Sequence, residues 1–267
     1  MKRLLALYRS TLGKKAIVAV TGIVMIGFLI GHVAGNLKIF LPPLEDGTPD
    51  IDHYAESLRT IGVPFVPYEA VLWVARFVLL GSLVLHVLCV IQLSSTNATA
   101  REISYSKRKF ATATSPARWM MFTGLYLLFF IIVHILHFTL GVIEPSQFEH
   151  GRVFGNLQAA FTRAPWALFY VVSMAVVALH LYHGAWSLFQ SMGWDNPDRN
   201  RGIRRFAAGL AVVLFIGFIA VPTAYLTGIV KLNQDESAAS HMHDRNSTGA
   251  TTGLSSSAEQ GKHNEEN

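Results

Sequence analysis

The sequence predicts an all-α integral membrane protein whose five transmembrane helices form a bundle. Hydrophobic residues make up 51% of the chain and charged residues only 15%. A soluble domain carries charge on about a quarter of its residues, so this composition is typical of a protein inside a membrane. Five apolar runs are also long enough to cross the hydrocarbon layer, which takes roughly 20 residues per helix.

The five expected spans alternate with polar loops. The first apolar run is too long for the hydrophobic part of a signal peptide and has no small-residue cleavage site, so we expect it to span. Pro165 suits the first turn of the fourth span, and Pro222 is a tolerated kink in the fifth. A short surface helix is expected in the first loop, over DHYAESLRTIG. The expected spans cover residues 16–33, 68–93, 118–143, 165–190 and 206–230.

The chain divides into three expected regions. Residues 1–15 form a basic N-terminal segment, residues 16–231 the five-helix domain, and residues 232–267 a polar tail. The tail has almost no large apolar side chains, so it cannot bury enough surface to fold and is predicted to be disordered. GWDNPDRNRGIRR, before the fifth span, is expected to be a charged turn, and residues 144–164 a loop.

The distribution of charge predicts the orientation in the membrane. Lys and Arg are in excess at the N-terminus and in segments 94–117 and 199–205. Segments 37–68 and 144–164 instead hold the acidic residues Glu45, Asp46, Asp50, Asp52, Glu56, Glu144 and Glu149. The positive-inside rule then places the N-terminus in the cytoplasm and the C-terminus outside. The basic residues are spread over several loops and form no footprint for a nucleic acid.

Several kinds of redox site are excluded by the residues. Cys89 is the one cysteine, and one thiol cannot form a disulfide, a cysteine zinc site or an iron–sulfur cluster. The sequence contains no G-x-G-x-x-G fingerprint for a flavin or nicotinamide and no P-loop. Any electron chemistry of this chain therefore requires electrons from another subunit.

Four of the five expected spans carry a histidine within an apolar stretch. An ionisable residue in the hydrocarbon layer costs free energy and is by default a candidate functional residue. The predicted orientation places two of these histidines in the outer half and two in the inner half, at levels roughly 15 Å apart. The outer pair is His32 in GFLIGHVAGNL and His134 in LLFFIIVHILH, and the inner pair is His86 in GSLVLHVLCV and His180 in VVALHLYHGAW.

Pairing by depth favours two haem b groups enclosed by the bundle. Neutral imidazole is a common ligand of haem iron, and two histidines at one level can fill both axial positions. The alternative is that each histidine forms a hydrogen bond between helices, a contact worth about 1 kcal/mol or less. That alternative gives no reason for the four histidines to pair by depth.

Taken together, the motifs resemble the cytochrome b membrane subunit of succinate:quinone oxidoreductase, of the single-chain, five-helix, di-haem type. The resemblance runs from about Ser10 to Val230 and excludes the tail. It rests on GKK..VAVTG..M..F...H..GNL..F, HYAESLR, LVLHV, the TG at 123–124 ten residues before His134, and HLYHGAWSLFQSMGW. It implies that His32 and His134 bind the distal haem iron, and that His86 and His180 bind the proximal haem iron. His137 and His183 are implied to contact the haems without binding iron.

The resemblance also implies a function. The chain would be the membrane anchor of succinate dehydrogenase, an enzyme subunit of the tricarboxylic acid cycle with no dehydrogenase site of its own. Its partners would be a flavoprotein subunit, an iron–sulfur subunit, membrane lipid and a quinone, which the resemblance implies to be menaquinone. The implied location is the bacterial cytoplasmic membrane.

Three alternatives stay open at this point. The complex could work in reverse as a fumarate reductase, because reduction potentials depend on details around the haems. The chain could anchor another respiratory oxidoreductase, such as a hydrogenase, although HGAWS argues against it. It could also be a transporter or assembly protein without haem, whose histidines relay protons; such a protein would be expected to carry acidic partners near the histidines.

Overall fold

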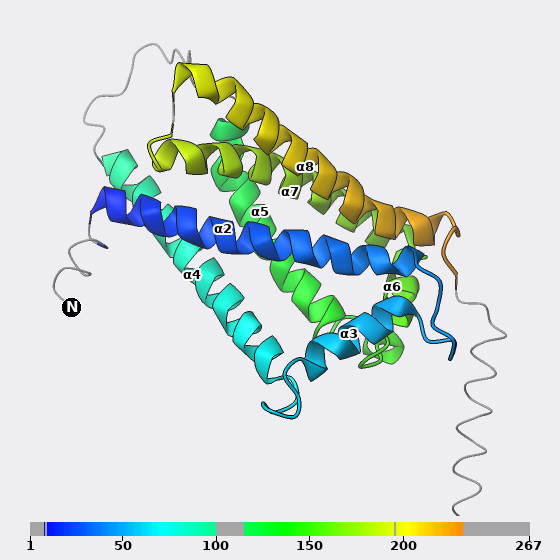
Figure 1. Ribbon diagram of the computed structural model, residues 1–267. Helices are drawn as coiled ribbons and strands as arrows, with labels where there is room; N and C mark the ends of the chain where they lie inside the picture. Colours follow the sequence, from blue (N-terminus) through cyan, green and yellow to red (C-terminus); the bar gives the residue numbers. More distant parts are fainter. Residues whose placement is uncertain (1–7, 9, 100–114, 195, 232–267) are drawn as a thin grey trace, which may run out of the picture.

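The computed structural model describes residue 8 and residues 10–99, 115–194 and 196–231, which form helices joined by turns and loops (Figure 1). The predictions for residues 1–7 and 9 and for the tail 232–267 lie outside the described residues. Five helices are long and apolar enough to cross a membrane, which confirms the predicted helical class and the number of spans. They are α2 (Thr11–Asn36), α4 (Ala70–Thr99), α5 (Ser115–Phe138), α7 (Ala164–Ser191) and α8 (Pro197–Leu226).

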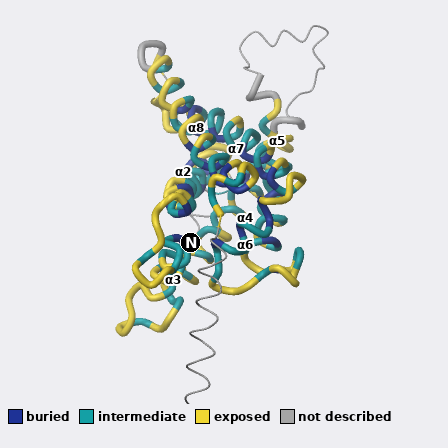
Figure 2. Tube along the Cα trace, turned by 90° about the vertical axis from the view of Figure 1, so that its right-hand side faces the viewer, coloured by how far each residue is buried: buried dark blue, intermediate teal, exposed yellow. Residues whose placement is uncertain are grey.

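The long helices expose large apolar side chains. Phe77 is 65% exposed, Phe122 65% and Val213 67%. Figure 2 shows exposed positions recurring along the long helices. A water-soluble protein rarely leaves so much contiguous apolar surface open, whereas lipid tails are as apolar as these side chains. The five helices therefore belong to a multi-pass membrane protein.

Local sequence signals explain where several helices begin and end. The Ser10 side chain accepts a hydrogen bond from the Gly13 N–H and caps α2. Helix α2 passes into a 3₁₀ turn, η1 (Leu37–Phe40), and Pro42 and Pro43 prevent it from continuing. Pro165 lies in the first turn of α7, as predicted, where its missing N–H is not needed.

Helices α7 and α8 pack along each other and, with α2, form the main core. Tyr225, Leu214 and Leu181 are buried there, each 5% exposed or less. Val33 of α2 packs against Gly217 of α8, where an added Cβ would lie 2.6 Å from the valine Cγ2. The small residue at position 217 therefore allows α2 and α8 to approach closely.

One end of the bundle is covered by short elements: η1, α3 (Asp50–Thr60), η2 (Pro145–Gln147) and α6 (Val153–Phe161). We call it the capped end; α2 ends there and α4 begins there (Figure 1). Lys38 pairs with Asp50 at 2.6 Å. The Phe154 N–H, in the first turn of α6, donates to Asp52 Oδ1 at 2.8 Å. Two carboxylates of α3 thus tie it to η1, which directly follows α2, and to α6.

The structure confirms the predicted short helix in the first loop, which is α3, and corrects the prediction that residues 144–164 are a loop. They contain α6, a helix of nine residues. Phe154, Leu157 and Phe161 share one face of it and are buried against the core. A helix this short depends on such tertiary burial. Starting a helix costs free energy, and a short helix forms few backbone hydrogen bonds to offset that cost.

Other helix boundaries also differ from the prediction, and two of the differences have a clear cause. The third span ends at Phe138 and not at residue 143, because the chain turns at Gly141, whose φ is 63°. The charged segment expected to be a turn is the start of α8, which begins at Pro197. The Trp186 Nε1–H of α7 donates to Asn200 Oδ1 at 3.0 Å, and the Arg204 guanidinium lies 4.0 Å from the Trp186 ring centroid. These contacts hold the polar first turns of α8 against α7.

Replacing Asp52 tests the cover of the capped end. Asp52→Ala removes the acceptor for the Phe154 N–H, and Arg152, at the N-cap of α6, offers no side-chain hydrogen bond in its place. The free energy of unfolding should fall by about 1 kcal/mol, the usual cost of losing a helix cap. Thermal unfolding of the purified protein in detergent measures the change. Glu45→Ala, an exposed change in the neighbouring loop, should leave the midpoint in place; equal losses in both variants would contradict the capping role.

Candidate functional site: two pairs of histidines between the helices

The structure brings His32 of α2 and His134 of α5 together. Their ring centroids lie 5.9 Å apart and the ring planes are nearly perpendicular, at 83°. Aromatic side chains from α2, α5, α7 and α8 surround the pair: Phe28, Phe130, Phe138, Tyr170 and Phe218. The two imidazoles therefore meet edge to face among aromatic side chains of four helices.

His134 has bonding capacity that the described protein leaves unused. Its Nδ1 is buried and has no hydrogen-bond partner among the described residues. A buried polar atom without a partner costs about 1–3 kcal/mol, so this nitrogen is an uncommon feature of the site. His32 and His134 are the two residues that would hold a haem iron at this level, each supplying an imidazole nitrogen.

His86 of α4 is bonded to α2. Its Nδ1 lies 3.1 Å from Thr21 Oγ1. The Thr21 hydroxyl also lies 2.7 Å from the carbonyl oxygen of Ile17, which can only accept a hydrogen bond. When the hydroxyl donates to that carbonyl, its oxygen accepts from His86, so Nδ1 carries the ring proton. Nε2 of His86 is then the unprotonated nitrogen, which is the form that binds a metal.

His180 of α7 repeats this arrangement on α5. Its Nδ1 lies 3.1 Å from Thr123 Oγ1, and that hydroxyl lies 3.0 Å from the carbonyl oxygen of Met120. The same reasoning leaves Nε2 of His180 unprotonated. His86 and His180 are thus two imidazoles on different helices, each bonded through Nδ1 to a threonine of another helix. We call them the His86–His180 pair.

Thr21 and Thr123 show that α2 and α5 each contribute to both pairs of histidines. Thr21 lies eleven residues before His32, and Thr123 eleven residues before His134. Eleven residues are close to three full helical turns, so each threonine shares a face with its histidine and lies about 16 Å away along the axis. Each of these helices supplies a histidine to one pair and a hydrogen bond to the other.

Sequence analysis quoted both T-G steps as motifs but assigned no role to either threonine, although a signal for one is present. T-G followed by nine residues and H occurs twice, as TGIVMIGFLIGH at 21–32 and TGLYLLFFIIVH at 123–134. The glycine of each repeat lies under a histidine ring. A Cβ on Gly124 would lie 3.3 Å from His180 Cε1, and one on Gly22 would lie 3.9 Å from His86 Cε1. Each T-G step thus places a hydroxyl group that bonds to the histidine next to a glycine that leaves room for its ring.

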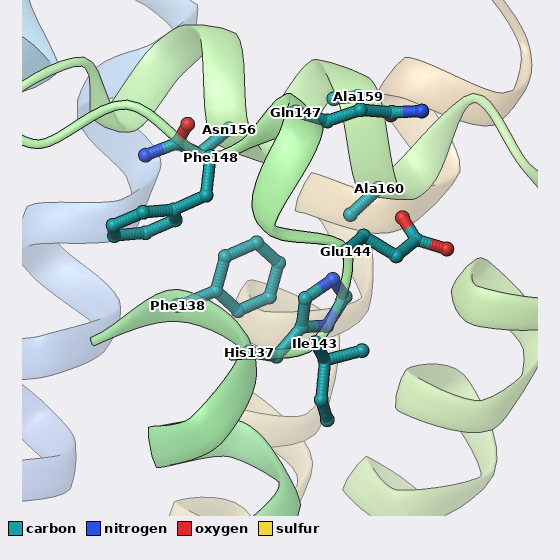
Figure 3. Close-up of a pocket in the computed structure, with 9 residues that line it drawn as sticks. All are labelled: His137, Phe138, Ile143, Glu144, Gln147, Phe148, Asn156, Ala159 and Ala160. Carbon is teal, nitrogen blue, oxygen red and sulfur yellow. The ribbon is translucent and has the colours of Figure 1, made fainter. Parts of the chain in front are cut away.

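His137 lies one turn beyond His134, in different surroundings. Its Nδ1 is 3.3 Å from the Tyr170 hydroxyl, and its ring lies 4.4 Å from that of Trp166. It lines a small cavity at the capped end together with Glu144, shown in Figure 3. The volume, about 10 Å³, is near the minimum that holds one water molecule. Glu144 accepts a hydrogen bond from the Trp166 Nε1–H at 3.1 Å and is paired with Arg163.

His183 follows His180 by three residues and packs edge-on against Trp186, with ring centroids 5.7 Å apart. Its Nδ1 is buried and has no hydrogen-bond partner within the described part of the chain. His183 is thus a second imidazole with unused bonding capacity near the His86–His180 pair.

Comparison with protein-family models, with curated proteins and with solved structures finds no match to this chain.

The contact between Gly124 and His180 can be tested with a matched pair of glycine variants. In the middle of a helix, Gly→Ala normally stabilises by about 0.5–1 kcal/mol. Gly124→Ala should instead lower the thermal midpoint, because the new methyl group displaces the His180 ring and weakens its bond to Thr123. Gly22→Ala should be neutral or stabilising, since its methyl group would meet His86 at ordinary contact distance. A raised midpoint in both variants would show that His180 does not lie against Gly124.

Proposed function

We propose that this chain is the cytochrome b membrane anchor of a succinate:quinone oxidoreductase. Its proposed cofactors are two haem b groups, one held by His32 and His134 and the other by His86 and His180. The observation that supports this best is the arrangement of four intramembrane imidazoles in two pairs, each pair drawn from two different helices. Haem b, when bound, supplies a one-electron carrier with both axial positions filled by imidazole.

Each group of residues has a distinct part in this proposal. The four histidines hold and orient the cofactors, with Nε2 of His86 and His180 available as a ligand. The hydroxyls of Thr21 and Thr123 keep the proton at Nδ1 of those two rings. The aromatic side chains around His32 and His134 exclude water, which protects an electron carrier from side reactions.

The charge at the two ends of the bundle supports one orientation, and with it the proposed order of electron transfer. Basic residues lie on α2 and α8 at the end away from the cover, among them Lys14, Lys15 and Arg201. We place this end in the cytoplasm by the positive-inside rule. An iron–sulfur subunit docked there would deliver electrons from succinate, oxidised by a flavoprotein, to the His86–His180 level. The His32–His134 level, near the capped end, would pass them to a quinone, with menaquinone as the proposed acceptor.

Reduction of a quinone to a quinol also takes up protons. At the capped end His137 and Glu144 line one cavity, and the Tyr170 hydroxyl lies 3.3 Å from His137 Nδ1. The position of this cavity, at the end of α5 where His137 lies one turn beyond His134, supports a quinone at this end of the bundle.

Counting haem per chain tests the proposal. A pyridine haemochrome assay on the complex purified from its native membrane should give two haem b per chain. His134→Ala and His180→Ala should each remove one, because each deletes an axial ligand of a different pair. His150→Ala, in a loop at the capped end, is the matched control and should retain both. Absence of haem from the unmodified protein, or unchanged haem content in both ligand variants, would refute the proposal.

A further inference from the structure

The two threonine–histidine bonds distinguish one pair of imidazoles from the other. Nδ1 of both His86 and His180 lies 3.1 Å from a threonine hydroxyl on another helix. His134, in the other pair, has a buried Nδ1 without a hydrogen-bond partner among the described residues. The two levels therefore differ in what bonds to the nitrogen on the far side of the ring from Nε2.

That nitrogen influences a metal bound at Nε2. An acceptor at Nδ1–H fixes the tautomer and the orientation of the ring, and it makes the imidazole a stronger electron donor. Stronger donation favours the oxidised iron, so it lowers the reduction potential. A hydroxyl is a neutral acceptor and adds no charge to the apolar interior, unlike the carboxylates that often orient metal-binding histidines.

Both histidines of this pair are bonded in the same way. Thr21 and Thr123 each precede a glycine that lies under the ring, and each hydroxyl can donate to a carbonyl of its own helix while accepting from the histidine. A threonine in a membrane helix often bonds to its own helix without any further role. A second bond to a histidine of another helix, repeated with the same T-G-x₉-H spacing, goes beyond that ordinary behaviour.

We propose that Thr21 and Thr123 are positioning residues that hold His86 and His180 in the Nδ1–H tautomer and lower the reduction potential of the haem bound between them. This inference rests on the proposed function, since it concerns a haem held by that pair. It adds to the proposed function by naming the residues that make the reduction potentials of the two haems differ.

The test is a redox titration of the purified complex, followed by visible absorption, with haem counted in every sample. Thr21→Val and Thr123→Val keep the shape of the side chain and remove the acceptor. In each variant the ratio of reduced to oxidised haem, at a fixed applied potential, should rise about fivefold for one haem, the factor carried by a hydrogen bond of ordinary net strength. The second haem should titrate as before. Thr21→Ser and Thr123→Ser keep the hydroxyl and should restore the original titration.

The matched control is Thr223→Val on α8, whose hydroxyl bonds to the Ile219 carbonyl of its own helix. It should leave both haems unchanged. Two bound haems with unchanged potentials in the Thr21→Val, Thr123→Val double variant would overturn the inference, as would an equal shift in the control. If a valine variant loses haem, recovery of haem and potential in the serine variant supports the inference, and failure to recover overturns it. Absence of haem from the unmodified complex would instead overturn the proposed function.

Discussion

An imidazole inside an apolar bundle needs a partner for each of its ring nitrogens, and the arrangement of this protein follows from that constraint. Water cannot supply the partner in the hydrocarbon layer, so another helix or a bound group must do so. His86 and His180 each use one nitrogen for a threonine on another helix. Nδ1 of His134 has no partner among the described residues. Nδ1 of His183, three residues after His180, is likewise buried without a partner in the described part of the chain. The histidines of α5 and α7 therefore carry the bonding capacity that the described protein leaves unused.

The same constraint explains why α2 and α5 each contribute to both pairs of histidines. Each carries a histidine at one level and a threonine about three turns away at the other, so a rotation of either helix would disturb both pairs at once. The core of α7 and α8 and the contact of Val33 with Gly217 fix these rotations from one side. At the capped end, Asp50 and Asp52 of α3 join η1, which follows α2, to α6. Packing remote from the histidines therefore contributes to the position of α2.

Much of the fold could be predicted from the sequence, because membrane helices are recognisable from length and apolarity alone. The five spans, the short helix α3 and the position of Pro165 all follow from local signals. Helix α6 was missed because it depends on burying Phe154 and Phe161 against helices distant in the chain. Thr21 and Thr123 were missed because a hydroxyl contact between helices depends on their relative rotation, which apolar periodicity does not give. The repeated T-G-x₉-H spacing is a usable signal. The structure explains it, because a histidine ring of another helix lies against the glycine of each repeat.

The most direct test of the account is a cryo-electron microscopy map of the complex purified from its native membrane. The account predicts two flat densities inside the bundle, one between His32 and His134 and one between His86 and His180, with centres roughly 15 Å apart along the helix axes. Imidazole rings should approach each density from both faces. A map in which protein side chains or ordered water fill the space between the paired histidines would contradict the account.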